Sequence, residues 1–285
     1  MKTLLTAISL CILSLSATAQ SKTDKQAAAI EKEGKALYRS EICSWNGTDI
    51  LLEKLGDRKK EVGGYFSYAD GDSMRFIFTT RGLNPGVLAS LAFDSTCAPD
   101  HAVVYMSKRD FTPYEKELYM IRTAVGRDLT YDTMYRSYKN TELNVIPVID
   151  GKTYKAYILT GPNDNGVIIF GNDYEITLDK NGDIKSRRKI HHDILIEQFD
   201  GTKNIEAGIH THLPSTGEMI TATDICTLML YEKLAKYKQY IVMSDKYVSL
   251  WDCTKDHLLV LTKEAWDRIY KDQEKRHPSS GQESK

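Results

Sequence analysis

The chain has 285 residues, of which 41% are hydrophobic and 27% are charged. This balance is typical of a globular protein with a sizeable apolar core, and it excludes a disordered chain. The 38 Lys and Arg residues nearly match the 39 Asp and Glu residues, so the formal net charge is −1. No overall field would draw such a chain onto polyanions, and we predict no nucleic-acid partner.

The N-terminus has the three parts of a secretory signal peptide. Met1 and Lys2 form a basic start, residues 4–15 are an almost uncharged apolar run, and Ala17-Thr18-Ala19 is a small-residue cleavage site. This pattern predicts removal of residues 1–19 and export to the periplasm or the extracellular space. No later apolar run approaches the roughly 18 residues needed to cross a bilayer, so we predict no membrane span.

Four cysteines remain after this cleavage, and an even number in an exported protein favours disulfides. They are Cys43, Cys97, Cys226 and Cys253. Of the three possible pairings we favour Cys43–Cys97 and Cys226–Cys253, because each joins cysteines of the same half of the chain. Four buried thiols are the alternative. No C-x-x-C spacing occurs, which argues against thiol catalysis.

The first half of the chain predicts a mixture of helices and strands. In chain order these are a helix over 21–38, a hairpin of strands over 65–68 and 74–79, strands over 87–93 and 102–106, and a helix ending near 125. Thr112, Pro113 and Glu115 form a capping box at the start of that second helix. The polar residues 126–140 indicate a boundary, so residues 20–140 are predicted to be a small α+β domain of unassigned role.

The second half predicts another α+β domain, over residues 141–272, followed by a disordered tail over 273–285. It begins with an antiparallel meander of four strands, over 154–160, over 167–170, over a run that ends at 178, and over 184–199. A strand over 207–212 and a helix over 223–237 follow. Strands over 240–243, 247–251 and 258–261 and a helix over 263–272 complete the domain. We therefore assign the chain to the α+β class.

Three residues at the passage from the predicted strand over 207–212 to the helix over 223–237 predict a metal site. His210 and His212 are two apart on a strand and project to the same face. Asp224 follows in the first turn of the next helix. Two histidines and one carboxylate, with water in the fourth position, are typical of catalytic zinc, which makes a nucleophile of its water. The alternative is a polar strand end before a plain helix N-terminus capped by Thr221. The two interpretations are compatible, because one carboxylate oxygen can cap while the other coordinates.

This segment resembles the JAMM (MPN-domain) metalloprotease family and its RadC-like relatives over about residues 145–262. The family signature is H-x-H, seven residues, Ser, two residues and Asp, and the chain has His210-Thr211-His212, then Thr221 and Asp224. The resemblance implies a mixed or antiparallel sheet with flanking helices. It also implies zinc-dependent hydrolysis of an amide or isopeptide bond in a peptide or cell-wall substrate, with Thr221 in place of the Ser that steadies the tetrahedral intermediate.

The chain departs from the family pattern in two respects: the spacing between the H-x-H and the following Thr221, and the general-base residue. The gap after the H-x-H is one residue longer, with Leu213 as the apparent insertion. The family has a Glu at the start of its first strand that takes a proton from the water, and the matching stretch 152–155 has no carboxylate. The possible substitutes are Asp150, Glu175 and Glu197, and we name Glu175 as a candidate catalytic residue.

The sequence leaves three hypotheses open. The first is an exported JAMM-like zinc hydrolase, and the second is a JAMM-like binding or scaffold module of the cell envelope without activity. The third is a secreted α+β binding protein in which the H-x-H is incidental. A second histidine pair, His191-His192, is predicted to lie at the surface, because adjacent residues on a strand point to opposite faces and cannot easily share one ion.

Overall fold

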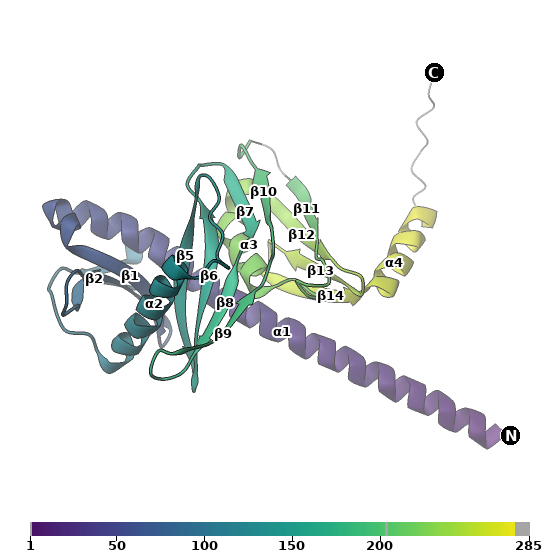
Figure 1. Cartoon of the computed structure of the whole chain (residues 1–285). Coiled ribbons are helices and arrows are strands. Elements are labelled where there is room, and N and C mark those ends of the chain that lie inside the picture. The colour runs from purple at the N-terminus through teal and green to yellow at the C-terminus, as the bar shows by residue number, and fades with distance from the viewer. Residues whose placement is uncertain (1, 203–204, 277–285) are drawn as a thin grey trace.

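The structure is a computed structural model that describes residues 2–202 and 205–276, with side chains described from residue 22 onward. It confirms the predicted α+β class (Figure 1). The helices are α1 (Lys2–Leu55), α2 (Pro113–Tyr131), α3 (Ala222–Ala235) and α4 (Lys263–Arg276), with the 3-10 helices η1 (Gly56–Glu61) and η2 (Pro99–His101). The side chains at the predicted cleavage site lie outside the described residues.

The strands form three four-stranded sheets and one two-stranded sheet among the described residues. The first sheet is β1 (Val62–Asp70), β2 (Ser73–Thr80), β3 (Val87–Phe93) and β4 (Val103–Tyr105). The second is β5 (Thr141–Asp150), β6 (Thr153–Pro162), β8 (Tyr174–Leu178) and β9 (Ile184–Lys189). The pair is β7 (Val167–Gly171) with β10 (Ile194–Gln198), and the last sheet is β11 (Ile205–Thr211), β12 (Tyr237–Met243), β13 (Tyr247–Asp252) and β14 (His257–Thr262).

The last sheet is mixed. β11 and β12 are parallel, while β12, β13 and β14 pair antiparallel. A parallel pair needs a crossover connection, and α3 provides it by following β11 and preceding β12. The crossover carries the chain from the end of β11 through residues 212–221 to the N-terminus of α3, and the candidate ligands predicted from the sequence lie at these two ends.

Helix α1 packs against elements from both halves of the chain, namely α3, β14 and the β1–β3 sheet. The predicted end near Tyr38 is wrong, because Cys43, Leu51 and Leu55 extend the buried face of the helix onto that sheet. The helix lies close to α3 at Gly34, where a Cβ atom would come within 2.6 Å of the Ile225 Cβ atom. Glycine at this position therefore permits the two helix backbones to approach.

One of the two predicted disulfides is present. Cys43 of α1 is bonded to Cys97, which follows β3, and this confirms the first pairing. The second pairing is wrong, because Cys226 and Cys253 are both free and buried. They belong to different parts of the core: Cys226 packs in the cluster that contains Leu37, and Cys253 in the cluster that contains Trp251.

The predicted strand over 184–199 is two strands. β9 ends at Lys189 on the β8 edge, and β10 begins at Ile194 on the β7 edge. Residues 190–193 cross from one sheet to the other, so they do not alternate as strand residues do. β5 was not predicted, although it runs along the whole of β6. At the C-terminus α4 continues to Arg276, so residues 273–276 of the predicted tail are helical.

The core beside α3 contains a carboxyl group whose ionisation opposes folding. Glu232 is buried and its Oε2 accepts a hydrogen bond of 2.9 Å from Trp251 Nε1. Burial, reinforced by Asp256, raises the pKa of Glu232 to about 7. The folded state therefore binds this proton more tightly than the unfolded state does, and stability falls as pH rises from about 4.5 to about 7.

We expect Glu232→Gln to be more stable than the wild type at pH 8, by on the order of 2 kcal/mol, and equally stable near pH 4.5. The amide oxygen of Gln keeps the acceptor for Trp251 but carries no charge. Urea unfolding of both proteins at the two pH values measures the difference. Parallel pH profiles of the two proteins would show that Glu232 is not the group responsible.

Candidate metal centre

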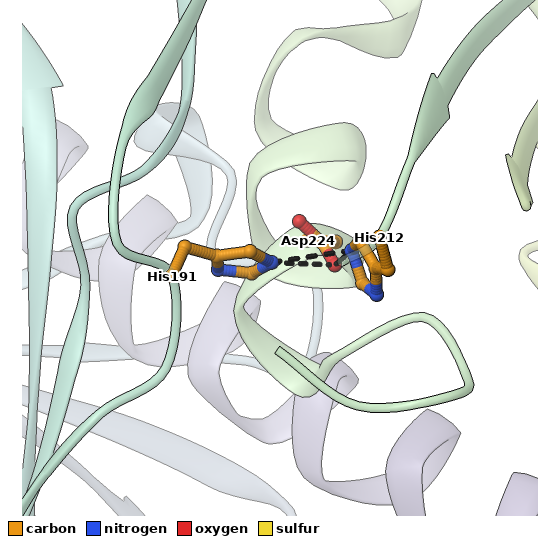
Figure 2. Close-up of side chains that lie close together, drawn as sticks. All are labelled: His191, His212 and Asp224. Atoms are coloured by element: carbon orange, nitrogen blue, oxygen red, sulfur yellow. Dashed lines mark hydrogen bonds and ion pairs between the residues drawn. The ribbon is translucent and has the colours of Figure 1, made fainter. Parts of the chain in front are cut away.

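His191, His212 and Asp224 are brought together by the fold, and one ligand atom of each lies within 4.8 Å of the other two (Figure 2). The Nε2 atoms of the two histidines are 3.2 Å apart. Asp224 Oδ2 lies 3.2 Å from His212 Nε2 and 3.6 Å from His191 Nε2. All three residues are buried. Such a group of two imidazoles and one carboxylate can bind a metal ion.

Each of the three residues comes from a different segment. His212 directly follows β11, and its backbone N–H continues the parallel ladder by donating to Met243 O at 2.8 Å. Asp224 is in the first turn of α3, at the end of the crossover. His191 lies in the crossing segment between β9 and β10, where its backbone N–H donates to Asp173 Oδ1 at 3.0 Å. The three side chains thus come from the end of a strand, the first turn of a helix and a loop (Figure 2).

The acceptors that hold Nδ1 leave Nε2 of both histidines as the nitrogen that faces the cluster. His212 Nδ1 lies 3.0 Å from the carbonyl oxygen of Met219, which can only accept, so Nδ1 carries the hydrogen. His191 Nδ1 lies 2.7 Å from Asp173 Oδ1 in the same way. A bound cation would take the Nε2 lone pairs of the two neutral rings, and without it the raised pKa of His191 places a hydrogen on the Nε2 of that ring. Ligating histidines are commonly oriented by such acceptors on their other nitrogen.

The charges around His191 favour a cation at this point. Burial lowers the pKa of His191, but the carboxylates of Asp224 and Asp173 outweigh it and raise that pKa to about 9. Burial in turn opposes ionisation of Asp224, yet His191 and His212 hold its pKa far below the ordinary range. The carboxylate is therefore ionised, and a positive charge is stabilised among these groups.

Asp224 has one unused oxygen. Its Oδ2 accepts from Thr221 N at 2.9 Å and from Thr221 Oγ1 at 2.8 Å, and its backbone N–H donates back to Thr221 Oγ1. This is the predicted capping box, which is confirmed. Oδ1 is buried and has no hydrogen-bond partner among the described residues. A buried carboxylate oxygen is usually paired, so the free oxygen indicates room for a ligand.

The separations suit a small transition-metal ion. Zinc bonds of 2.0–2.1 Å in a tetrahedron place neighbouring ligand atoms about 3.3 Å apart. The three distances among His191 Nε2, His212 Nε2 and Asp224 Oδ2 are 3.2, 3.2 and 3.6 Å. These atoms therefore have the separations of one face of a zinc tetrahedron, and because Oδ2 caps α3, the free Oδ1 is the oxygen with which Asp224 would coordinate.

His210 borders this group. Its Nε2 lies 3.1 Å from His212 Nε2 and 3.9 Å from Asp224 Oδ1. Its Nδ1 lies 3.3 Å from the Tyr240 hydroxyl, which donates its own hydrogen to Glu197 Oε1. Burial and Glu197 raise the pKa of Tyr240, so the phenol keeps its proton. Burial, with the neighbouring histidines, lowers the pKa of His210 to about 4, so this ring is neutral near pH 7.

The contact between His210 and Tyr240 depends on a glycine. A Cβ atom on Gly208 would lie 2.3 Å from the Tyr240 ring, which is closer than any real contact. Gly208 is two residues before His210 on β11, so both face the same side of the strand. The absence of a side chain at 208 lets the Tyr240 ring lie across β11 and reach His210.

The cluster opens into a pocket of about 480 Å³ between β10 and β11. Its lining includes His191, His210, His212 and Asp224, together with apolar side chains. Three of these are exposed, namely Leu195 (39%), Ile209 (56%) and Leu213 (61%). A ligand that enters the pocket would therefore pass exposed apolar side chains before it reaches the histidines and Asp224.

The structure brings some of the predicted residues together and leaves others apart. His212 and Asp224 are in the cluster, His210 borders it, and Thr221 caps α3. Glu175 lies on β8 with Tyr157 and Arg188 as its partners, neither of which belongs to the cluster. Asp150 is exposed at the end of β5. Glu197 contacts Tyr237 and Tyr240 rather than the cluster itself.

The prediction that His191 lies at the surface is wrong. His191 is buried in the cluster, while His192 is exposed. The surface prediction assumed a continuous strand over 184–199. Residues 190–193 are a loop instead, so the strand alternation does not apply to His191. Asp173, which orients His191, carried no signal in the sequence either.

A scan against protein-family models finds no match, and searches of curated proteins and of solved structures find no significant one. The JAMM resemblance is therefore a hypothesis that rests on the motif residues. Within the part of the chain that the structure describes, no helix has the length and apolar character to cross a membrane.

Proposed function

We propose that His191, His212 and Asp224 bind zinc and that the protein is an exported zinc-dependent hydrolase. Its substrates would be amide or isopeptide bonds of a peptide or of the cell wall. The observation that carries this proposal is the convergence of two Nε2 atoms and one carboxylate at the separations of tetrahedral zinc, with a pocket on the remaining side. Three protein ligands and an open fourth position are typical of catalytic zinc.

Zinc in such a site lowers the pKa of a water ligand to about 7 and polarises carbonyl groups. The resemblance to the JAMM family supports hydrolysis of amide bonds, since the H-x-H strand, the crossover and the acidic first turn follow in the family's order. His191 is an addition to that signature. Export is supported by the N-terminal pattern of residues 1–19.

We assign the role of general base to His210 in place of the family Glu. A base must come within hydrogen-bond reach of the reacting water. His210 lines the pocket beside the three ligands, and its Nδ1 is engaged with Tyr240, so Nε2 is the nitrogen that would accept the proton. Tyr240 and Glu197 would act on His210 only by fixing its ring.

A second function, a zinc-stabilised binding module of the cell envelope, is favoured by one specific observation. His210 Nε2 is close enough to His212 and Asp224 to serve as a fourth protein ligand. Four protein ligands close the shell, and closed shells are typical of structural zinc. The two functions therefore differ in what His210 does.

The test is to measure zinc by elemental analysis and hydrolysis by release of amino groups, in the mature protein and in His210→Gln. The substrates are purified peptidoglycan and an isopeptide-linked peptide. We expect about one zinc per chain in both proteins, hydrolysis by the wild type, and a loss of at least about 100-fold in His210→Gln. Loss of zinc from His210→Gln, with no hydrolysis by the wild type, supports the binding module. Absence of zinc from the wild type after incubation with zinc contradicts both.

A further inference from the structure

A second pocket, of about 530 Å³, lies between α1, β1, α2, β5 and β6, and it shares no lining residue with the pocket at the metal centre. Its walls are mostly apolar and include Leu37, Met74, Leu118 and Ile146, all of them buried. Its size falls within the range of about 300–1,000 Å³ that is usual for small-molecule sites.

Two polar atoms in this pocket are unpaired. Ser40 is 7% exposed, and both its Oγ and the Arg39 Nε are buried without a hydrogen-bond partner among the described residues. Both residues line the pocket. Buried donors of this kind are normally paired, so two of them on residues that line one apolar pocket indicate a ligand.

Arg39 also lacks a counter-charge among the described residues. Its guanidinium makes one hydrogen bond, from Nη2 to the backbone carbonyl oxygen of Asp72 at 3.2 Å. The half-buried cation Lys155 of the pocket is already engaged, because it pairs with Glu33 and donates to the Tyr157 hydroxyl. Lys32 is exposed at the margin. The positive charge available inside the pocket is therefore that of Arg39.

We propose that this pocket binds a monocarboxylate with an apolar body. The carboxylate would lie on the Arg39 guanidinium and accept from the Ser40 hydroxyl, and the apolar part would lie against the walls. A planar guanidinium matches a carboxylate by paired N–H bonds and is more weakly hydrated than an ammonium group, which suits a partly buried site. This site is independent of the zinc hydrolase proposed above.

Isothermal titration calorimetry of the mature protein with octanoate tests the proposal, with octylamine as the probe of opposite charge. The variants are Arg39→Gln and, as the matched control, Lys54→Gln, which removes a cation from an exposed position of the same helix outside the pocket. We expect octanoate to bind the wild type and Lys54→Gln equally and to bind Arg39→Gln at least tenfold more weakly. Octylamine should not bind. Equal affinity of Arg39→Gln and the wild type overturns the proposal.

Two further variants locate the ligand. Ala36→Trp adds a large side chain from the exposed part of α1 that lines the pocket, and it should weaken octanoate binding without changing Arg39. His212→Ala should leave octanoate binding unchanged. If His212→Ala abolishes binding, the carboxylate is bound at the metal centre and the pocket on α1 is not its site. Circular dichroism establishes that each variant is folded.

Discussion

Replacing His191 by alanine is expected to lower the zinc content of the purified protein from about one ion per chain to less than about a tenth. His191 supplies one of three ligand atoms, and because His210 acts as the base in the proposed hydrolase, only one imidazole and one carboxylate remain, which are too few to hold zinc against dialysis. The measurement is elemental analysis after dialysis against zinc-free buffer.

The neighbouring residue provides the matched control. His192 is exposed, so His192→Ala removes an imidazole one position away without altering the cluster, and its zinc content should equal that of the wild type. If both variants keep their zinc, the ligand set is the one predicted from the sequence, with His210 in place of His191. A variant with His210→Ala then becomes the zinc-free one.

Removing the Cys43–Cys97 disulfide is expected to lower the free energy of unfolding by about 4 kcal/mol. The bond closes a loop with a sequence separation of 54, and cross-links over loops of that length mainly restrict the unfolded chain. The double variant Cys43→Ala, Cys97→Ala should therefore unfold at a clearly lower urea concentration than the wild type.

The control for the disulfide is reduction. Dithiothreitol should destabilise the wild type toward the variant and leave the variant unchanged, since Cys226 and Cys253 are free thiols. A wild type that is insensitive to reductant, with a variant of equal stability, would mean that the bond does not form in solution.

Local patterns were the part of the fold that the sequence could predict. Both capping boxes depend on residues three apart, and Thr112 with Glu115 and Thr221 with Asp224 form as expected. β1 and β2 form the hairpin that was predicted from strands over 65–68 and 74–79. Asp224 lies beside His212 because it is in the first turn of the helix that follows the H-x-H strand.

Contacts between distant segments were the part that it could not predict. The position of His191 depends on where β9 ends. β9 ends because the chain crosses to pair with β7 as β10, and no local sequence pattern reveals this crossing. The Cys226–Cys253 pairing failed for a related reason. Sequence proximity suggested a bond, but packing against α1 and against β13 directs the two thiols into separate parts of the core.

The boundary between β10 and β11, here called the seam, affects which part of the fold loses its hydrogen-exchange protection first. β10 pairs with β7 and β11 pairs with β12, so the two strands that border the metal centre belong to different sheets. Side chains join the two sheets: Tyr237 and Tyr240 of β12 donate to Glu197 of β10, and His191 contacts His212. An ion bound by His191 and His212 would act as a cross-link over this seam. Its removal should increase amide hydrogen exchange in β10 and β11 first, while the ladders within each sheet stay protected.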